Sequence, residues 1–167
     1  MDIVDLLGDP AYRHVLLNHI PIVGLFVALA VLLTGIALRQ PALLFTALVL
    51  VALTAGSSIP VANYGDAAYP AIFDTLDGDG RKWLDYHAEL AECWLPVLYA
   101  NTALAVIAII AGALRPRLLP WAALLVALVT LAGFAGTTII ASAGGKIQHP
   151  EFRISDPPEV ESSLRQH

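Results

Sequence analysis

Residues 27–33 read VALAVLL and residues 43–53 read LLFTALVLVAL, and these two runs decide the fold. Both are apolar on every side of a helix, whereas the surface helices of a soluble bundle show a polar stripe at helical spacing. The whole chain has a mean hydropathy of +0.71, with 57% hydrophobic and 14% charged residues. A soluble bundle of buried helices is therefore the less favoured alternative, and we interpret the runs as parts of membrane-spanning helices.

Charged residues are absent from four long segments of the chain. Each segment exceeds the roughly 20 residues that a helix needs to cross the hydrocarbon core. A backbone in lipid must satisfy its own hydrogen bonds, so these segments are expected to be helical. The segments are 14–38, 40–65, 93–114 and 118–145, and the predicted helices lie near 15–38, 41–62, 86–113 and 118–142. The predicted fold is all-α, an integral membrane antiparallel four-helix bundle that runs up-down-up-down.

The orientation follows from two very short connections, Arg39–Pro41 and Arg115–Arg117, which hold three arginines and no acid. The positive-inside rule places them in the cytoplasm. Both termini and the segment 63–85, which we predict to be a loop, then lie on the outer, periplasmic side. Residues 1–153 are predicted to form the transmembrane domain, and residues 154–167 a flexible C-terminal tail.

Composition excludes several classes of function. Nine basic against fourteen acidic residues give a net charge of −5, which offers no electrostatic support for a nucleic-acid partner. The single cysteine, Cys93, forms no intrachain disulfide and no thiolate metal cluster. Within the predicted loop, Asp77 to Gly80 resemble the start of a calcium loop, but the remaining ligand positions are wrong. We predict instead a turn that ends in the N-cap of the third helix.

Four histidines are the most informative feature. His14 and His19 open the first helix, His87 opens the third, and His149 follows the fourth. Up-down topology brings all four to the same outer face. Ionisable groups near membrane segments are candidates for function, although a histidine ring can also sit at the interface for its amphipathic character alone. The predicted cofactor ligands are His19, His87, His149 and His14, and the first three are the predicted metal ligands.

The direction in which each side chain points around its helix reduces the number of candidate ligands. His14 and His19 are five residues apart, about 140° around an ideal helix, so both cannot point the same way. We favour His19 because it lies deeper, although Pro21 can bend this turn and weaken the argument. On the third helix Trp83, His87 and Trp94 share a face that would wall a cofactor or belong to the core. The other polar residues that we expect to support the site are Asn18, Asp85, Glu89, Glu151 and Arg153.

The glycine pair Gly144 and Gly145 is predicted to end the fourth helix and to allow a sharp turn. The chain would then fold back over the mouth of the bundle and bring His149 toward His19 or His87. In this arrangement Glu151 and Arg153 would pair with each other or cap the site.

The histidine motifs resemble those of a largely uncharacterised family of small bacterial four-helix membrane proteins. They are LNHIPIVG at residues 17–24, Asp85-Tyr86-His87, and GGKIQHPEFR at residues 144–153. Members of the family usually carry Glu directly after the second motif's histidine, where this chain has Ala88. The resemblance covers roughly residues 14–153. It implies the four-helix fold and the importance of His19, His87 and His149, but it implies no reaction.

The first functional hypothesis is a b-type haem protein. Two neutral imidazoles on facing helices ligate iron axially, and small residues beside them admit the porphyrin. Covalent c-type attachment is excluded because no Cys-x-x-Cys-His motif is present. Such a protein would pass electrons between a quinol pool and an outer-face acceptor.

Three alternatives stay open. A non-haem site of copper, zinc or iron would use His19, His87 and His149 with a carboxylate or His14. A structural or anchor subunit would dock a membrane or periplasmic partner through its acidic outer face. A small-solute or proton pathway has no membrane-embedded acid or lysine to support it. No nucleophile–base spacing is present, so the isolated chain is not expected to be an enzyme.

Overall fold

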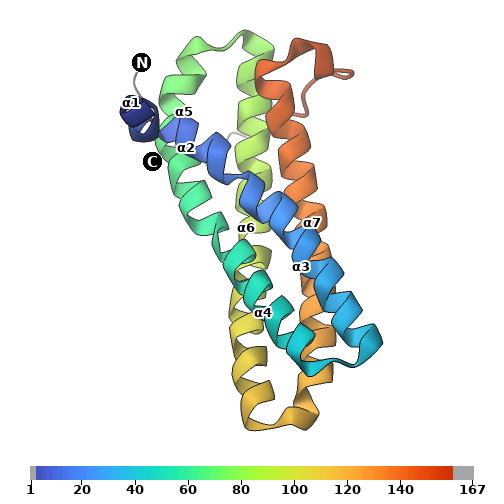
Figure 1. The fold of residues 1–167 in the computed structure, drawn as a ribbon. Coiled ribbons are helices and arrows are strands. Elements are labelled where there is room, and N and C mark those ends of the chain that lie inside the picture. Colours follow the sequence, from blue (N-terminus) through green and yellow to red (C-terminus); the bar gives the residue numbers. More distant parts are fainter. Residues whose placement is uncertain (1–2, 160–167) are drawn as a thin grey trace.

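Four long apolar helices pack as a bundle in the computed structural model, which describes residues 3–159 (Figure 1). The all-α bundle is therefore confirmed. Successive long helices run antiparallel, and α2 and α5 extend the first two helices of the bundle. The elements are α1 Ile3–Gly8, α2 Pro10–Leu17, α3 His19–Leu38, α4 Pro41–Gly56, α5 Ser58–Thr75, α6 Gly78–Leu114, η1 Pro116–Leu118, α7 Leu119–Gln148 and η2 Pro150–Phe152.

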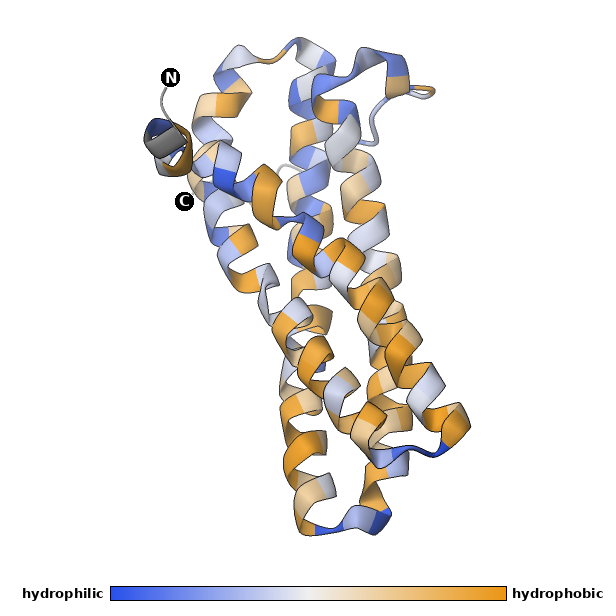
Figure 2. Cartoon of the chain, viewed as in Figure 1, coloured by the Kyte–Doolittle hydropathy of each residue, from blue (hydrophilic) through white to orange (hydrophobic). Residues whose placement is uncertain are grey.

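The chain is a multi-pass membrane protein with four candidate spans, each long and apolar enough to cross a bilayer. The spans are Pro10–Leu38, Pro41–Thr75, Gly78–Leu114 and Pro116–Gln148. Large apolar side chains are exposed on the outside of the bundle, such as Leu53 at 66% and Leu128 at 61%. Figure 2 shows that hydrophobic residues predominate along the lower part of the helices. Such a surface is suited to contact with lipid tails rather than with water.

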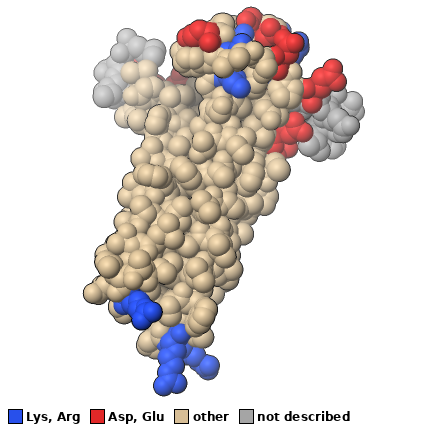
Figure 3. All heavy atoms as spheres, turned by 90° about the vertical axis from the view of Figure 1, so that its right-hand side faces the viewer, with Lys and Arg blue, Asp and Glu red and all other residues tan. Residues whose placement is uncertain are grey.

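On the face shown in Figure 3, charged side chains gather at the two ends of the molecule, and the surface between the ends carries none. One end, which we call the arginine end, holds the connections α3–α4 and α6–η1–α7 with Arg39, Arg115 and Arg117. At the opposite end, which we call the histidine end, acidic and basic side chains are mixed.

The helix ends at the arginine end agree with the sequence prediction to within a few residues. There the chain reverses in a tight turn in which Arg39 adopts a left-handed conformation with φ of 52°. The amides of Arg39 and Gln40 reach back to the carbonyls of Ile36 and Gly35, which satisfies the end of α3.

At the histidine end the prediction of a loop over 63–85 is wrong. In this range only Leu76 and Asp77 lie outside α5 and α6. The polar residues of α5 suggested a loop, but its apolar residues recur at helical spacing. Tyr69, Ile72 and Phe73 pack against a cluster that contains Trp83 and Leu84 of α6. This packing holds α5 as a helix beyond the apolar span.

Two of the four spans are broken at one residue each. The first break lies at Asn18 between α2 and α3, and the second at Ser57 between α4 and α5, and both residues keep right-handed helical backbone angles. A proline stands three residues after each break, Pro21 and Pro60. Proline has no amide hydrogen and its ring crowds the carbonyl of residue i−4, which loosens the helix just before it. Proline alone does not break a helix here, because Pro96 lies within the unbroken α6.

The breaks divide the histidine end into two helix pairs. Here α2 packs mainly against α5, α6 packs closely along α7, and contact between the two pairs is sparse. In Figure 1 the pairs separate toward this end, where α2 and α5 lean away from α6 and α7. The histidines of α2 and α6 therefore come from different pairs.

Small residues bring α6 and α7 together. A Cβ atom on Gly136 would lie 2.4 Å from the Trp94 ring, and one on Gly133 would lie 3.0 Å from Leu98. Further along this contact, the Thr130 hydroxyl lies 3.2 Å from Oδ1 of the fully buried Asn101. Close approach at glycines and a polar contact between helices are both typical of packing in membranes.

Candidate functional site

His14 of α2 and His87 of α6 face each other across the two helix pairs. Their ring centroids lie 6.1 Å apart, and the ring planes are nearly perpendicular at 87°. The residues are 73 positions apart in the sequence, so the pair exists only through the fold. Both rings are partly buried among helices.

Each ring is fixed by a backbone carbonyl of the neighbouring helix in its own pair. Nδ1 of His14 lies 2.9 Å from the carbonyl of Val61 on α5, and Nδ1 of His87 lies 2.9 Å from the carbonyl of Ile140 on α7. A carbonyl can only accept a hydrogen bond, so Nδ1 must donate in both rings. In the neutral ring this leaves Nε2 without a proton, as a metal-ligating imidazole requires.

A glycine stands behind each of the two rings. A Cβ atom on Gly65 of α5 would lie 2.9 Å from Nδ1 of His14, and one on Gly144 of α7 would lie 3.1 Å from Cε1 of His87. These distances are shorter than ordinary van der Waals contacts. Glycine at both positions therefore lets each imidazole lie close against the partner helix of its pair.

A narrow cavity of about 80 Å³ lies between the two rings and continues toward the core. Most of its wall is apolar, but it also holds Asn18, Ser58 and Thr137. The hydroxyls of Ser58 and Thr137 bond to carbonyls of Ala55 and Phe134. Asn18 differs because its buried Oδ1 has no hydrogen-bond partner. The complete lining is His14, Asn18, Ile22, Ser58, Val61, Ala62, His87, Ala91, Leu95, Leu98, Thr137, Ile140 and Ala141.

His19 and His149, which the sequence placed in the site, do not join this pair. His19 is exposed and its Nδ1 bonds to the carbonyl of Val15 in the preceding turn. His149 is exposed, lies 2.9 Å from Glu151 and stacks at 5.0 Å on Phe152. The preference for His19 over His14 is thus reversed. The two side chains do point different ways, as their spacing of five residues requires, but it is the shallower His14 that faces the neighbouring helices.

The glycine pair does not end the fourth helix as predicted, because α7 continues to Gln148. Gly144 instead makes room for His87, and a Cβ on Gly145 would meet only Phe152 at 3.9 Å. The expectation that the chain folds back to carry His149 into the site is therefore wrong.

Arg153, the last residue of the GGKIQHPEFR motif, connects two helices at the histidine end. Its guanidinium donates to the carbonyls of Lys146 and Ile147 at the end of α7, and to Asp77 at 2.8 Å. Asp77 is the N-cap of α6 and accepts from the amide of Gly80 at 2.6 Å, as the predicted turn requires. Arg153 thus joins the last carbonyls of α7 to the first turn of α6.

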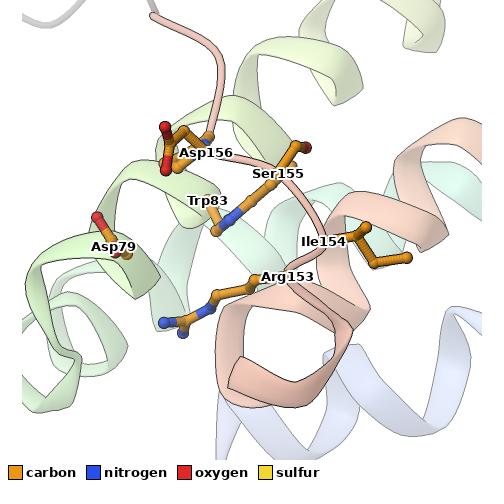
Figure 4. Close-up of a pocket in the computed structure, with 7 residues that line it drawn as sticks. Asp79, Trp83, Arg153, Ile154, Ser155 and Asp156 are labelled. Carbon is orange, nitrogen blue, oxygen red and sulfur yellow. The ribbon is translucent and has the colours of Figure 1, made fainter.

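The chain after η2 crosses the start of α6 and encloses a second hollow of about 280 Å³ (Figure 4). Its walls include Arg153, the buried Trp83 and the carboxylates of Asp79 and Asp156. The Lys146 ammonium covers the Trp83 ring at 4.3 Å. Trp83 is therefore a core residue of the histidine end and is not part of the wall of the imidazole cavity.

The hydrogen bond between Arg153 and Asp77 predicts how the Asp77 carboxylate responds to pH. The hydrogen bond from Arg153, together with the Gly80 amide, lowers the pKa of Asp77 below its ordinary value of 3.8. The stabilisation from this contact is thus complete above that value and is lost as the pH falls through the lowered pKa. In Arg153→Gln we expect the midpoint to move up toward 3.8, measured from the Gly80 amide chemical shift in detergent. Lys82→Gln is the control, because Lys82 pairs with Asp79. An unchanged midpoint in Arg153→Gln would contradict this assignment.

The remaining supporting residues lie around the pair rather than between the rings. The Tyr69 hydroxyl donates to Asp85, which ties α5 to α6 one turn above the site. Trp94 packs flat on Gly136, and Glu89 is half-buried on α6. Neither Glu89 nor Glu151 lines the imidazole cavity.

The geometry brings together two imidazoles and no further ligand. Within residues 3–159, no three His, Cys, Asp or Glu side chains are grouped so that they could hold a metal ion. Small residues such as Ala62, Ala91 and Ala141 flank the rings. The site can therefore supply two nitrogen ligands from two helix pairs, with a mostly apolar slot between them.

Comparison with known proteins found no matching family model, no matching curated protein and no matching solved structure. The resemblance of the histidine motifs to a bacterial membrane family stays a prediction.

Proposed function

We propose that the chain is a membrane electron-transfer protein that binds b-type haem, and that His14 and His87 are the residues that would hold its iron. The observation that carries the proposal is the facing pair of imidazoles, each with Nδ1 hydrogen-bonded to a carbonyl. When bound, the haem supplies one-electron chemistry. The chain holds the iron, fixes the ring orientations and excludes water from the slot.

The number of ligands favours haem over a bare ion. A structural zinc site takes four ligands, and a catalytic one takes three from the protein. Residues 3–159 bring only two histidines together, with no third His, Cys, Asp or Glu beside them. Haem iron already has four porphyrin nitrogens and needs only two more ligands, so two imidazoles suffice.

The separation of the rings is short enough for both to reach one metal ion. Their centroids lie 6.1 Å apart. Because metal–nitrogen bonds are about 2 Å long, two imidazoles at this separation would be able to hold a single iron.

The slot between the rings sets how a porphyrin would lie. The cavity of about 80 Å³ is smaller than the several hundred Å³ of sites that bury a whole cofactor. A bound haem would therefore need the α2–α5 and α6–α7 pairs, whose mutual contact is sparse, to separate further. The small side chains of Ala62, Ala91 and Ala141 line the cavity beside the two histidines.

The arginine end would face the cytoplasm by the positive-inside rule, which places the histidine pair near the outer surface. Electrons would then pass from a quinol pool in the bilayer to an acceptor on the outer side, in a bacterial inner membrane. The mixture of charges at the histidine end suits a polar outer partner (Figure 3).

The proposal is tested by purifying the chain in mild detergent after expression with added haem precursor. A spectrum of the dithionite-reduced minus the oxidised protein should show the sharp α band of a low-spin b-type haem, at one haem per chain. A colourless protein that does not take up added haemin would overturn the proposal. Metal analysis of such a colourless protein would distinguish a bound copper, zinc or iron ion from an empty scaffold.

Two neighbouring glycines provide a sharper test of the ligand geometry. Gly144→Ala would place a methyl group about 3.1 Å from the His87 ring, whereas Gly145→Ala meets only Phe152 at 3.9 Å. We expect Gly144→Ala to displace the imidazole and convert much of the haem to the high-spin form, and Gly145→Ala to retain the wild-type spectrum. Absorption and electron paramagnetic resonance spectra measure this. Equal spectra for the two variants would contradict the placement of His87 on Gly144.

A further inference from the structure

We propose that the arginine end of the bundle is a binding surface for the headgroup phosphate of an anionic phospholipid. The surface is formed by Arg39, in the turn between α3 and α4, and by Arg115 and Arg117, between α6 and α7. Figure 1 shows that these two connections lie at the same end of the bundle. This end is opposite to the histidine pair, so lipid binding there does not depend on the proposed haem site.

The three arginines carry positive charges that no side chain of the described chain neutralises. All three are exposed, and among residues 3–159 their guanidinium groups have no hydrogen-bond or ion-pair partner. In the sequence, no acidic residue lies between Asp9 and Asp66 or between Glu92 and Glu151. Figure 3 likewise shows no acidic side chain beside the basic ones at this end, on the face that it draws. A partner of this surface must therefore supply the negative charge.

The basic side chains at the histidine end differ, because each of those that the structure describes has a partner in the chain. Their guanidinium or ammonium groups contact carbonyl oxygens, carboxylates or aromatic rings. They belong to Arg13, Arg81, Lys82, Lys146 and Arg153. Unpaired positive charge is thus confined to the arginine end within residues 3–159. A guanidinium group offers parallel N–H donors that match the oxygens of a phosphate, so phosphate is the anion that this end suits best.

The backbone at Arg39 gives a second, independent indication of a binding role. Within residues 3–159, Arg39 is the only residue other than glycine with a positive φ, which is 52°. Its amide and that of Gln40 close the end of α3, and glycine is the usual residue at this position because a Cβ atom crowds the left-handed conformation. Residues in such conformations concentrate at binding sites. We attribute the arginine here to contact between its guanidinium group and an anion.

Apolar side chains next to the arginines favour a lipid over a soluble anion. Leu38 precedes Arg39, Leu114 precedes Arg115, and both leucines are exposed. Trp121, in the first turn of α7, is also exposed, and tryptophan is typical of membrane interfaces. A free phosphate or an oligonucleotide would leave these side chains in water, whereas a phospholipid covers them with its acyl chains. Anionic lipids are favoured over phosphatidylcholine, whose own cation lies beside its phosphate.

Retention of phosphatidylglycerol by the full chain in mild detergent is the test, measured by native mass spectrometry. Phosphatidylcholine with the same acyl chains is the neutral comparison, and we expect the wild-type protein to retain phosphatidylglycerol more strongly. Each arginine near an anionic lipid surface strengthens binding about fivefold. The affinity for phosphatidylglycerol should therefore fall about fivefold in Arg115→Gln or Arg117→Gln. It should fall about 100-fold when Arg39 is also replaced by glutamine in the triple variant.

Arg39→Gly separates lipid binding from folding. Glycine adopts the left-handed conformation without strain, so this variant should be at least as stable as wild type in detergent that lacks phosphatidylglycerol. Its affinity for phosphatidylglycerol should nevertheless fall about fivefold. Lys82→Gln is the matched control, because it removes one positive charge at the histidine end, where Lys82 pairs with Asp79. It should retain wild-type affinity.

Three results would contradict the proposal. One is equal retention of the two lipids by the wild-type protein, and another is wild-type affinity in the triple glutamine variant. The third is a loss of affinity in Lys82→Gln as large as that in Arg39→Gly. Glycerol phosphate, the headgroup without acyl chains, should not displace the lipid at an equal concentration. Displacement would show that the arginines bind free phosphate and would overturn the assignment to a lipid. All of these measurements are independent of haem content, so they do not test the proposed function.

Discussion

Replacement of His87 by alanine is expected to abolish haem binding. His87 is held on the continuous α6–α7 pair by the Ile140 carbonyl and by the flat surface at Gly144. Its loss leaves His14 as the only imidazole at the slot, on the short helix α2. Loss of a partner that merely orients a metal ligand costs about 10- to 100-fold in affinity, and loss of the ligand itself costs more. Haem per chain, measured from the pyridine haemochrome after purification, should therefore fall to background.

His19→Ala is the control for this experiment. His19 has the same side chain and lies on the same span as His14, but it is exposed and contacts its own helix turn. It should retain full occupancy. Full occupancy in His87→Ala, or loss of haem in His19→Ala with an intact bundle, would contradict the assignment of the ligands. Circular dichroism of the detergent-solubilised variants verifies that the helices are intact.

The second large effect is expected at Gly136, in the contact between α6 and α7. A Cβ atom here would lie 2.4, 2.5 and 2.9 Å from three atoms of the Trp94 ring. An indole is rigid, so the helices must separate or the ring must leave its position. Overpacking of this kind costs about 1–3 kcal/mol. Gly136→Ala should therefore lower the free energy of unfolding by about this amount, measured by titration with a denaturing detergent.

Gly56→Ala is the matched control because it also adds one methyl group to a helical glycine of the bundle. Its Cβ would lie 3.5 Å from Thr102, an ordinary contact. Alanine also favours the helix over glycine by about 1 kcal/mol, so this variant should be as stable as wild type or more so. A second substitution, Trp94→Leu, should recover part of the stability lost in Gly136→Ala. Additive effects of the two substitutions would refute the steric explanation.

The sequence predicts the apolar spans well, because the length of each apolar run and the charged residues that flank it show where the span lies. At the arginine end, Arg39 and Arg115 terminate the apolar runs, and the helices end beside them. At the histidine end, polar residues follow the runs, but the chain stays helical through α5 and through the first turns of α6. Pattern alone does not reveal that Tyr69 and Ile72 pack on Trp83, because that contact depends on a helix that is distant in sequence.

The candidate site was predictable in part. The sequence shows His87 near the start of a predicted helix and Gly144 in a glycine pair. It does not show that the two residues are in contact. The choice between His14 and His19 failed because it rested on depth along the span. The direction in which His14 points depends instead on the packing of α2 against α5, which the sequence does not show.

The contact between Asn101 and Thr130 has a consequence for how the bundle assembles. It lies in the part of α6 and α7 that is buried from lipid, where a stranded amide costs several kcal/mol, on the order of 2–7. Nδ2 of this amide already has no hydrogen-bond partner among residues 3–159. Sliding α7 by one turn would remove the contact at Oδ1 as well, and it would also take Gly144 away from His87. The Asn101–Thr130 contact therefore favours a single longitudinal register of the two antiparallel helices.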